Sequence, residues 1–345
     1  MKEKVNITIH DLAKELDLSP STISRALKDH PSIGAQTRAN VQKLAKLRGY
    51  RPNIMAVNLR NQQSKTIGVL ISWINRPFFS NLISGIEEAA REKGYNVIIS
   101  QTTDDLKIEK DNAKTLYDIR ICGLITSISI ETLEYPHFGQ FYRSNTPVIF
   151  VDRVPGDFQG QKVVIDNYQA GYDATTHLIE QGCTRLAHLG GSLKQGLYKE
   201  RLRGFRQALE DHNLVLNPNY ILNGKSLSRE ESLVLATKLF EDGQGPDGIF
   251  GANDMAGVCA ILVAKKYGKT VPDDVAVIGF NDDPICEIVD PPLSSMYHPA
   301  REMGRICVKR ILDSLNKNNQ SDDLSILTTE LVPRKSTLRI VEIES

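Results

Sequence analysis

The chain lacks the marks of a secreted, disulfide-bonded or membrane-spanning protein. Its five cysteines are odd in number and scattered, and no two form a CxxC pair. This usage argues against a disulfide or zinc framework and favours reduced thiols in a cytosolic protein. The first residues, MKEKVNITIHDL, contain no apolar signal-peptide core, and no run of about 18 apolar residues predicts a membrane span. We therefore expect a cytoplasmic protein.

Catalytic and cofactor motifs are also missing. The glycine spacings of dinucleotide and phosphate-loop sites do not occur, and Gly190-Gly191 is more typical of a tight turn. The seven histidines are scattered without metal-ligand pairing, and no nucleophile elbow is present. The sequence therefore predicts no enzyme, no metal site and no cofactor.

The chain has no net charge, but its charged residues are unevenly distributed along it. The whole chain has a formal net charge of zero, yet residues 1–64 carry eleven Lys and Arg against five Asp and Glu. That segment is therefore +6 and the remainder −6. A basic head on an acidic body is what phosphate binding by one end requires.

The basic segment has the pattern of a helix-turn-helix. Thr8 and Asp11 form a capping box, and Ser19 can cap a second helix with Pro20 at its first position. The apolar residues at helical spacing that we expect to face inward are Ile9, Leu12, Ala13, Leu16, Ile23 and Leu27. The polar positions left on or near the outer face of the second helix are Ser21, Thr22, Ser24 and Arg25.

A third helix is expected over residues 35–48. The side chains predicted to point inward from it are Val41, Leu44, Ala45 and Leu47. A plain three-helix bundle would show the same pattern. The charge asymmetry favours the DNA-binding interpretation, in which the second helix enters a major groove.

The body alternates strands and helices. With 345 residues and 41% hydrophobic residues, the chain should form two or three units with a sizeable core. Continuous apolar strands separated by helices predict parallel sheets covered on both faces, with ligands at the carboxyl ends of the strands. The expected strands are 67–72, 95–100, 123–129, 147–152, 163–167, 185–191, 220–224, 248–254 and 275–282. The expected helices are 79–93, 108–119, 168–181, 199–212, 229–242 and 255–267.

Several motifs together resemble the LacI/GalR family of bacterial transcriptional regulators, nearly end to end. They include TIHDLAKELDLSPSTISRAL, NLR before TIGVLI, VIDNYQAGYDATTHLIEQG, RLRGF, GIFGANDMAG, VPDDVAVIGFNDD and PRKST. The resemblance implies an all-α helix-turn-helix headpiece (1–50), a hinge helix and linker (51–64) and an α/β periplasmic-binding-protein-like core (65–345). The core would have an N-subdomain (about 65–155 and 290–323) and a C-subdomain (about 160–285 and 324–345). Crossings between them are expected near 152–161, 282–292 and 324.

The resemblance also implies the DNA contacts. The family's base-reading positions match Pro20, Ser21 and Arg25, and Arg25 can pair bidentately with guanine. Pro20 departs from relatives that have a polar or larger side chain there. The phosphate-contacting positions match Thr8, Thr22, Ser24 and Asn53, although Thr8 could equally be a helix cap alone.

The hinge RPNIMAVNLR would place Ala56 near the minor groove and wedge Leu59 between central base pairs. A helix of about nine residues is marginal alone. It should therefore form against its dimer mate and DNA.

The effector positions implied by the family match Ser72, Phe78, Asp152, Arg201, Asn253 and Asn281. Arg201 would hold a ligand hydroxyl or carboxylate. Asn281 stands where many relatives have Asp, and the stretch near Ser226 lacks the aromatic residue that sugar-binding relatives often carry. Asp152 and Asp254 could instead be structural carboxylates that cap turns.

Together these features predict a homodimeric, ligand-responsive transcriptional regulator. Its expected partners are double-stranded operator DNA with a palindromic site and a small effector, a sugar or sugar derivative. We expect a repressor of carbohydrate-related genes. Control by a protein co-regulator is an alternative, and a sugar-binding transport protein is a further one that the headpiece disfavours.

Overall fold

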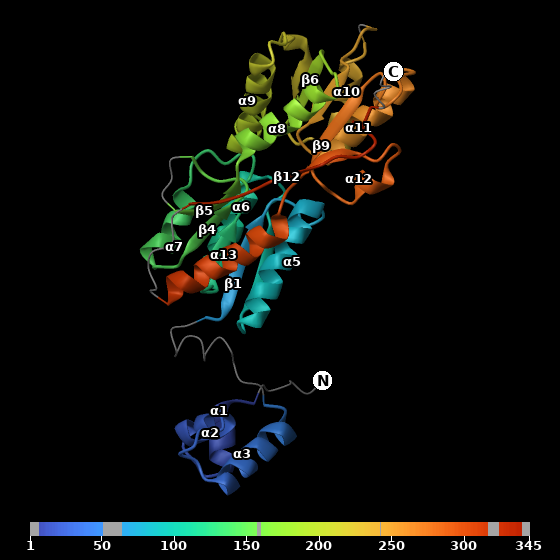
Figure 1. Ribbon diagram of the computed structural model, residues 1–345. Helices are drawn as coiled ribbons and strands as arrows, with labels where there is room; N and C mark the ends of the chain where they lie inside the picture. The colour runs from blue at the N-terminus through green and yellow to red at the C-terminus, as the bar shows by residue number, and fades with distance from the viewer. Residues whose placement is uncertain (1–6, 51–63, 157–159, 242, 317–323, 340–345) are drawn as a thin grey trace, which may run out of the picture. The chain divides into compact units, whose positions relative to one another are not determined.

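The computed structural model describes residues 7–50, 64–156, 160–241, 243–316 and 324–339. The chain divides into two compact units, residues 1–64 and 65–345 (Figure 1). Nearly all of the expected hinge, with its residues Asn53, Ala56 and Leu59, lies outside the described residues. No helix in the described part of the chain is long and apolar enough to cross a membrane.

The described residues 7–50 of the first unit form three short helices around a small core. They are α1 (Ile9–Glu15), α2 (Pro20–Leu27) and α3 (Ala35–Arg48). The predicted capping box of Thr8 and Asp11 is confirmed, as are the Ser19 cap and Pro20 at the first position of α2. The buried core residues are Leu12, Ala13, Ile23, Ala26, Val41 and Ala45.

The prediction that Leu47 points into the core of this unit is wrong, because its side chain is 78% exposed. At 100° per residue, Leu47 lies about 240° around α3 from Val41, whereas Ala45 lies about 40° from it. The apolar seam therefore runs through Val41 and Ala45, and Leu47 faces away from it.

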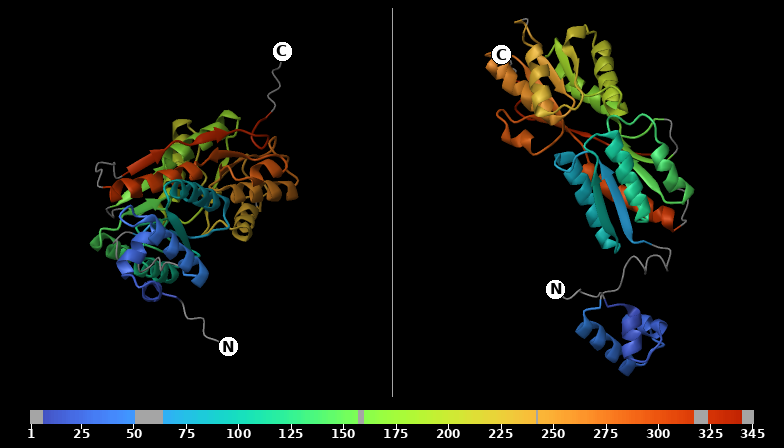
Figure 2. Two further views of the ribbon diagram at one scale, coloured as in Figure 1. Left: turned by 90° about the horizontal axis from the view of Figure 1, so that it is seen from below. Right: turned by 180° about the vertical axis from the view of Figure 1, so that it is seen from behind.

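The described residues of the core unit form two six-stranded sheets. The first has the order β11-β5-β4-β3-β1-β2 and is parallel throughout. Its strands are β1 (Thr66–Ile71), β2 (Asn96–Gln101), β3 (Gly123–Thr126), β4 (Val148–Val151), β5 (Gln161–Ile165) and β11 (Leu324–Leu327). Helices α5 (Pro77–Glu92) and α13 (Ala300–Leu315) cover one face (Figure 1), and α6 (Leu106–Asp118), η1 (Pro136–Phe138) and α7 (Gly139–Arg143) lie on the other (Figure 2). We call this sheet with its helices the N-subdomain.

The second sheet has the order β12-β10-β9-β8-β6-β7, and β12 is antiparallel to β10. Its strands are β6 (Leu186–Gly190), β7 (Ile221–Asn223), β8 (Gly248–Gly251), β9 (Ala276–Asn281), β10 (Ser294–Tyr297) and β12 (Glu330–Val332). Its helices are α8 (Asn167–Glu180), α9 (Gly196–Asp211), η2 (Pro218–Tyr220), α10 (Arg229–Lys238), α11 (Asp254–Lys266) and α12 (Ile285–Ile288). We call this sheet with its helices the C-subdomain.

The crossings between the subdomains differ from those expected. The chain crosses after β5 near Asp166, at His298-Pro299, and between β11 and β12 at Thr328-Thr329. Consequently β5 and β11 lie in the N-subdomain sheet and β10 in the C-subdomain sheet, opposite to the predicted assignment. A short apolar run shows that a strand is buried, but it carries no information about which neighbour the strand pairs with.

Within each subdomain, one pair of helices packs with its backbones in direct contact. A Cβ on Gly171 of α8 would clash with the Arg201 carbonyl of α9, and a Cβ on Gly85 of α5 would clash with the Arg301 carbonyl of α13. Glycine at these positions lets the backbones touch. The contact of α8 with α9 fixes the height of Arg201 above the sheet.

Candidate functional site

The polar face of α2 is partly organised by its own cap. The Ser19 hydroxyl accepts from the Thr22 amide at 3.1 Å and lies 2.8 Å from the hydroxyls of both Ser21 and Thr22. Arg25 is exposed and forms no ion pair with any residue that the structure describes. Pro20 and Ser24 are half-buried. The Arg25 guanidinium therefore has its donors available for another molecule.

Thr8 is committed to helix α1. Its hydroxyl donates to Asp11 Oδ2 at 2.7 Å and accepts from the Asp11 amide at 3.3 Å. The bonds that the Asp11 carboxylate accepts from the Thr8 hydroxyl and, at 2.8 Å, from the Thr8 amide lower the pKa of the Asp11 carboxyl. The single hydroxyl proton is used within the cap, so a phosphate contact through it would cost that bond. The geometry favours the capping role.

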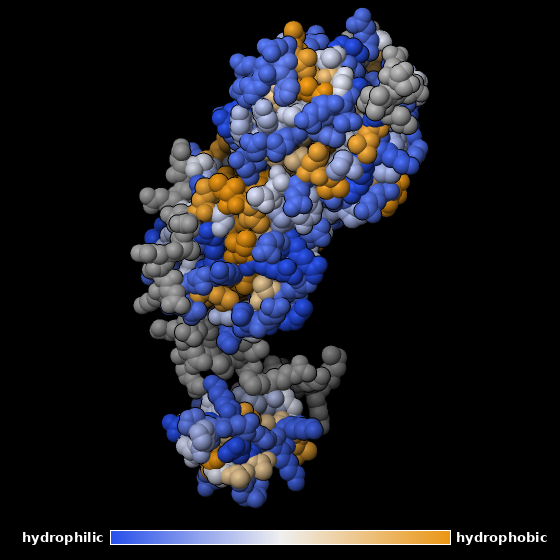
Figure 3. Space-filling model, in the orientation of Figure 1, coloured by the Kyte–Doolittle hydropathy of each residue, from blue (hydrophilic) through white to orange (hydrophobic). Residues whose placement is uncertain are grey.

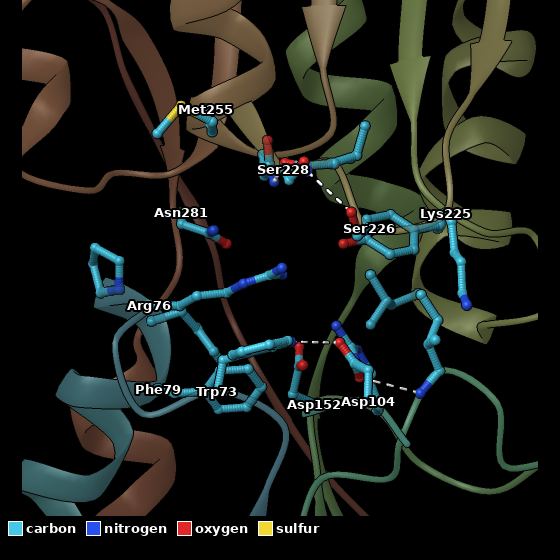
Figure 4. Close-up of a pocket in the computed structure, with 18 of the residues that line it drawn as sticks. Trp73, Arg76, Phe79, Asp104, Asp152, Lys225, Ser226, Ser228, Met255 and Asn281 are labelled. Carbon is cyan, nitrogen blue, oxygen red and sulfur yellow. Dashed lines mark hydrogen bonds and ion pairs between the residues drawn. The ribbon is translucent and has the colours of Figure 1, made fainter. Parts of the chain in front are cut away.

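A cavity of about 760 Å³ lies between the two subdomains, at the carboxyl ends of the strands (Figure 4). Of the six positions expected from the sequence, five line it: Phe78, Asp152, Arg201, Asn253 and Asn281. Ser72 does not line the cavity: it is fully buried, and its Oγ lies 3.5 Å from Nη1 of Arg153, which does line it.

Arg201 is a buried cation without a carboxylate partner among the described residues. Its Nε donates to Asn167 Oδ1 at 2.8 Å and its Nη1 donates to the Ala252 carbonyl at 2.7 Å. The guanidinium carbon lies 3.5 Å from the ring centroid of Phe280. Burial lowers the pKa of Arg201 to about 10, which leaves it charged at neutral pH. The neutral contacts orient this positive charge without cancelling it.

Asp152 and Asn281 occupy similar places in the two subdomains: Asp152 directly follows β4, and Asn281 is the last residue of β9. Both have positive φ, 61° at Asp152 and 114° at Asn281. Burial raises the pKa of the Asp152 carboxyl, against the opposing effect of Arg153 and Arg201. Asn281 Oδ1 lies 3.3 Å from His298 Nδ1. The cavity thus has a carboxylate on one side and an amide on the other.

Asn253 and Asp254 have structural partners. Asn253 caps α11 through its Oδ1, 2.8 Å from the Ala256 amide, and its Nδ2 donates to the Leu227 carbonyl at 3.3 Å. Asp254 accepts from the Ser295 hydroxyl at 2.6 Å and from the Asp283 amide at 2.7 Å. Burial raises the pKa of Asp254 to about 6. These contacts support a turn-capping role for Asp254.

Sequence reasoning missed several cavity residues on the N-subdomain side. The indole of Trp73 donates to Asp104 Oδ2 at 2.9 Å, and the same carboxylate forms an ion pair with Arg153. Arg76, the residue before α5, extends into the cavity and forms no ion pair with described residues (Figure 4). Burial lowers the pKa of Arg76. Trp73, Asp104 and Arg153 all lie one to three residues beyond a strand, and that position could have identified them.

The loop at Ser226 lines the cavity without an aromatic side chain. Its backbone is fixed by Glu231, whose carboxylate accepts the amides of Lys225, Ser226 and Leu227, each at 2.7 Å. The aromatic side chains at the cavity come mainly from the other subdomain: Trp73, Phe78 and Phe79. The cavity therefore combines an aromatic wall with converging charged and amide groups.

Comparisons with known proteins agree along the chain. Residues 8–53 match the model for bacterial regulatory proteins of the lacI family, and residues 175–337 match a periplasmic binding protein-like domain. The HTH-type transcriptional repressor CytR of Escherichia coli (strain K12) is 30% identical over 338 residues, covering 97% of this chain and 98% of that protein.

Two solved structures extend the comparison. The lac repressor dimer bound to operator and the anti-inducer ONPF has a TM-score of 0.85 at 24% identity, covering 97% of this chain and all of that one. The transcriptional regulator CelR in complex with cellobiose has a TM-score of 0.72 at 25% identity, covering 96% of this chain and all of that one.

Proposed function

This chain belongs to the lacI family of bacterial regulatory proteins, DNA-binding and ligand-responsive repressors, and we propose on that premise that its core cavity binds a small polyhydroxylated effector, a sugar or sugar derivative. One observation carries the proposal. The buried guanidinium of Arg201 has no carboxylate partner in the described chain and lies in the same cavity as the Asp152 carboxylate. A guanidinium donates to hydroxyl oxygens and a carboxylate accepts from hydroxyl groups, so the pair suits a ligand rich in hydroxyls.

The walls of the cavity add an apolar surface. Trp73, Phe79 and Met255 contribute to the lining, and aromatic faces suit the C–H faces of a sugar ring. CelR is solved with cellobiose, and a related periplasmic binding protein/LacI regulator with D-xylulofuranose. We assign the direct effector contacts to Phe78, Asp152, Arg201 and Asn281, with Trp73 and Arg76 added. Ser72 and Asn253 support the site from their structural positions.

The helix-turn-helix unit supplies the DNA-binding end. We propose that Arg25 reads a guanine edge and that Ser21 makes a second base contact beside Pro20, with Thr22, Ser24 and Asn53 on phosphates. Ala56 and Leu59 would contact the minor groove, with Leu59 as its wedge. Two copies of the chain would read the two halves of a palindromic operator.

The core also offers surface for a second copy. Figure 3 shows hydrophobic patches among the hydrophilic surface of the core unit. Exposed apolar side chains of the C-subdomain include Leu262 of α11, at 44%, and Ile288 of α12, at 76%. Apolar side chains of this kind are what a homodimer interface buries.

The chain contains a single tryptophan, Trp73, which lines the cavity. Its fluorescence therefore reports on this site directly. We would titrate the full chain with neutral sugars, sugar phosphates and sugar acids, and measure operator affinity with and without each compound that changes the emission. A sugar should change both, and Arg201→Lys should weaken both effects. A bound compound that leaves operator affinity unchanged, or an operator response that needs an added protein, would contradict the proposal.

A further inference from the structure

We propose that Gln195 is a latch that holds the two subdomains together across the cavity before any effector binds. Gln195 lies at the start of α9 in the C-subdomain and is 3% exposed. Its Nε2 donates to two carbonyls of the N-subdomain, that of Ser129 at 3.3 Å and that of Ile130 at 3.0 Å. A neutral side chain thus makes a buried bridge between the two halves of the core.

The acceptor side of this bridge is built in advance within the N-subdomain. The buried carboxylate of Glu109 on α6 accepts from the Ser129 amide at 2.5 Å and from the Thr132 hydroxyl at 2.8 Å. His137 Nε2 lies 2.9 Å from the same carboxylate. The loop after β3 is therefore held by its own subdomain, and its carbonyls are placed for a partner.

Asp104 connects this loop to the cavity wall. Its Oδ1 accepts from the Ile130 amide at 3.2 Å, and its Oδ2 accepts from the indole of Trp73 at 2.9 Å. The loop that receives the Gln195 amide therefore shares one carboxylate with the tryptophan of the cavity. A displacement of this loop should therefore change the surroundings of Trp73 through Asp104.

A second contact between the subdomains involves the same loop, but it is an exposed ion pair. Lys225 of the C-subdomain, seen in Figure 4, pairs with Glu131 at 3.2 Å, but their side chains are 70% and 45% exposed. Exposed ion pairs contribute little and are screened by salt. The buried amide is the stronger of the two contacts because water does not compete for it.

Removing the amide donors acts mainly on the closed state. The Ser129 carbonyl would keep the Thr132 amide at 3.0 Å, whereas the Ile130 carbonyl would be buried without that donor. An unpaired buried carbonyl is costly, and opening the cavity would hydrate it. Gln195→Met preserves side-chain length, and we expect it to raise the open population about tenfold. Gln195→Glu places a carboxylate against two carbonyls and should open the cavity further.

The latch is tested without a ligand, with acrylamide as the quencher of Trp73. In the full chain, the quenching constant should rise at least twofold in Gln195→Glu, with a smaller rise in Gln195→Met. Hydrogen exchange of the segment 127–133 should accelerate about tenfold in Gln195→Met. Gln207→Ala, which removes a surface bond to Asp211 on the same helix, and Lys225→Met should both behave as the wild type.

Folded Gln195 variants with wild-type quenching and exchange would overturn the proposal. An increase in exchange spread over the whole core, with a fall in melting temperature, would also overturn it, because Gln195 would then only support the fold. The effect on the effector rests on the proposed function: the apparent Kd of the effector should rise by the factor by which the closed population falls. The quenching test stands apart from it because acrylamide is the only added molecule.

Discussion

Replacing Arg201 with alanine should lower stability and abolish the effector response together. The guanidinium donates to Asn167 and to the Ala252 carbonyl and lies over Phe280, all within the C-subdomain. Its loss leaves a cavity, a bare carbonyl and an unpaired amide oxygen. Charged hydrogen bonds contribute about 1.5–3 kcal/mol each, and part of this is recovered because a buried cation is also removed. We expect a net loss of about 2–4 kcal/mol in the free energy of unfolding.

Stability and response can be separated with a matched variant. Asn167→Ala breaks the 2.8 Å bond to Arg201 Nε, and Asn167 does not line the cavity. This variant should lose about 1 kcal/mol of stability and keep the effector response. Arg201→Lys should have an effector response between those of Asn167→Ala and Arg201→Ala, because lysine keeps the positive charge but loses the planar guanidinium.

The assay combines urea unfolding of the full chain with operator affinity measured with and without the sugar identified by Trp73 fluorescence. An Arg201→Ala protein as stable as the wild type would refute the structural part of the argument. Loss of response in Asn167→Ala as complete as in Arg201→Ala would refute direct recognition by the guanidinium.

Three further predictions follow from the described residues. Arg25→Ala should cost about 1–3 kcal/mol of specific operator binding per half-site and leave dimerisation intact; an unchanged footprint in a protection assay would exclude Arg25 from base reading. Ser19→Ala should destabilise the helix-turn-helix unit by about 1 kcal/mol, through loss of the α2 cap, as a melt of that unit would show. Burial, with a smaller effect of Arg201 and Arg206, lowers the pKa of the fully buried His188 to about 3. An unfolded histidine takes up a proton below about pH 6.5, whereas the buried His188 stays neutral. The free energy of unfolding therefore falls by about 1.4 kcal/mol per pH unit below that pH and is not reduced by His188 above it. His188→Leu should flatten the fall in stability between pH 7.5 and 5.5, and an unchanged slope in urea unfolding would contradict this.

Local signals gave the reliable part of the sequence prediction. The capping box at Thr8, the Ser19 cap and the bounds 35–48 of the third helix depend on neighbouring residues only, and all are confirmed. The assignment of β5, β10 and β11 to subdomains was wrong because it depends on partners far along the chain. The prediction that Leu47 faces the core was wrong for a related reason: the apolar residues of a helix do not all lie on the face that packs against its neighbours.

The cavity was partly predictable for the same reason. Positions such as Asp152 and Asn281 lie at strand ends, and the carboxyl ends of parallel strands meet at one edge of the sheet. Trp73 and Arg76 were missed, although they come shortly after β1. Their role depends on side-chain direction, which is set by contacts such as the bond from Trp73 to Asp104. Their position after β1 could have identified them as candidates, but no local sequence pattern encodes that long-range contact.

Backbone strain marks the cavity independently of any relative. Eleven non-glycine residues of the described chain have positive φ. Most of those outside the cavity are Asp or Asn, such as Asn145 and Asn213, which tolerate this conformation through local hydrogen bonds. Five of the eleven line the cavity: three are again Asp or Asn (Asp104, Asp152 and Asn281), and two, Thr103 and Leu227, are not.

Leu227 is the clearest case, because a leucine side chain gains no local hydrogen bond to offset a φ of 49°. Its backbone is retained by the Glu231 carboxylate, which accepts the Leu227 amide at 2.7 Å. Such strain costs on the order of 1–3 kcal/mol per residue and persists only where surrounding contacts enforce it. At Thr103 and Leu227 this cost falls on residues that line the cavity. Recognition of a ligand is a reason to keep it there, because it requires side chains and amides in positions that relaxed loops would not give.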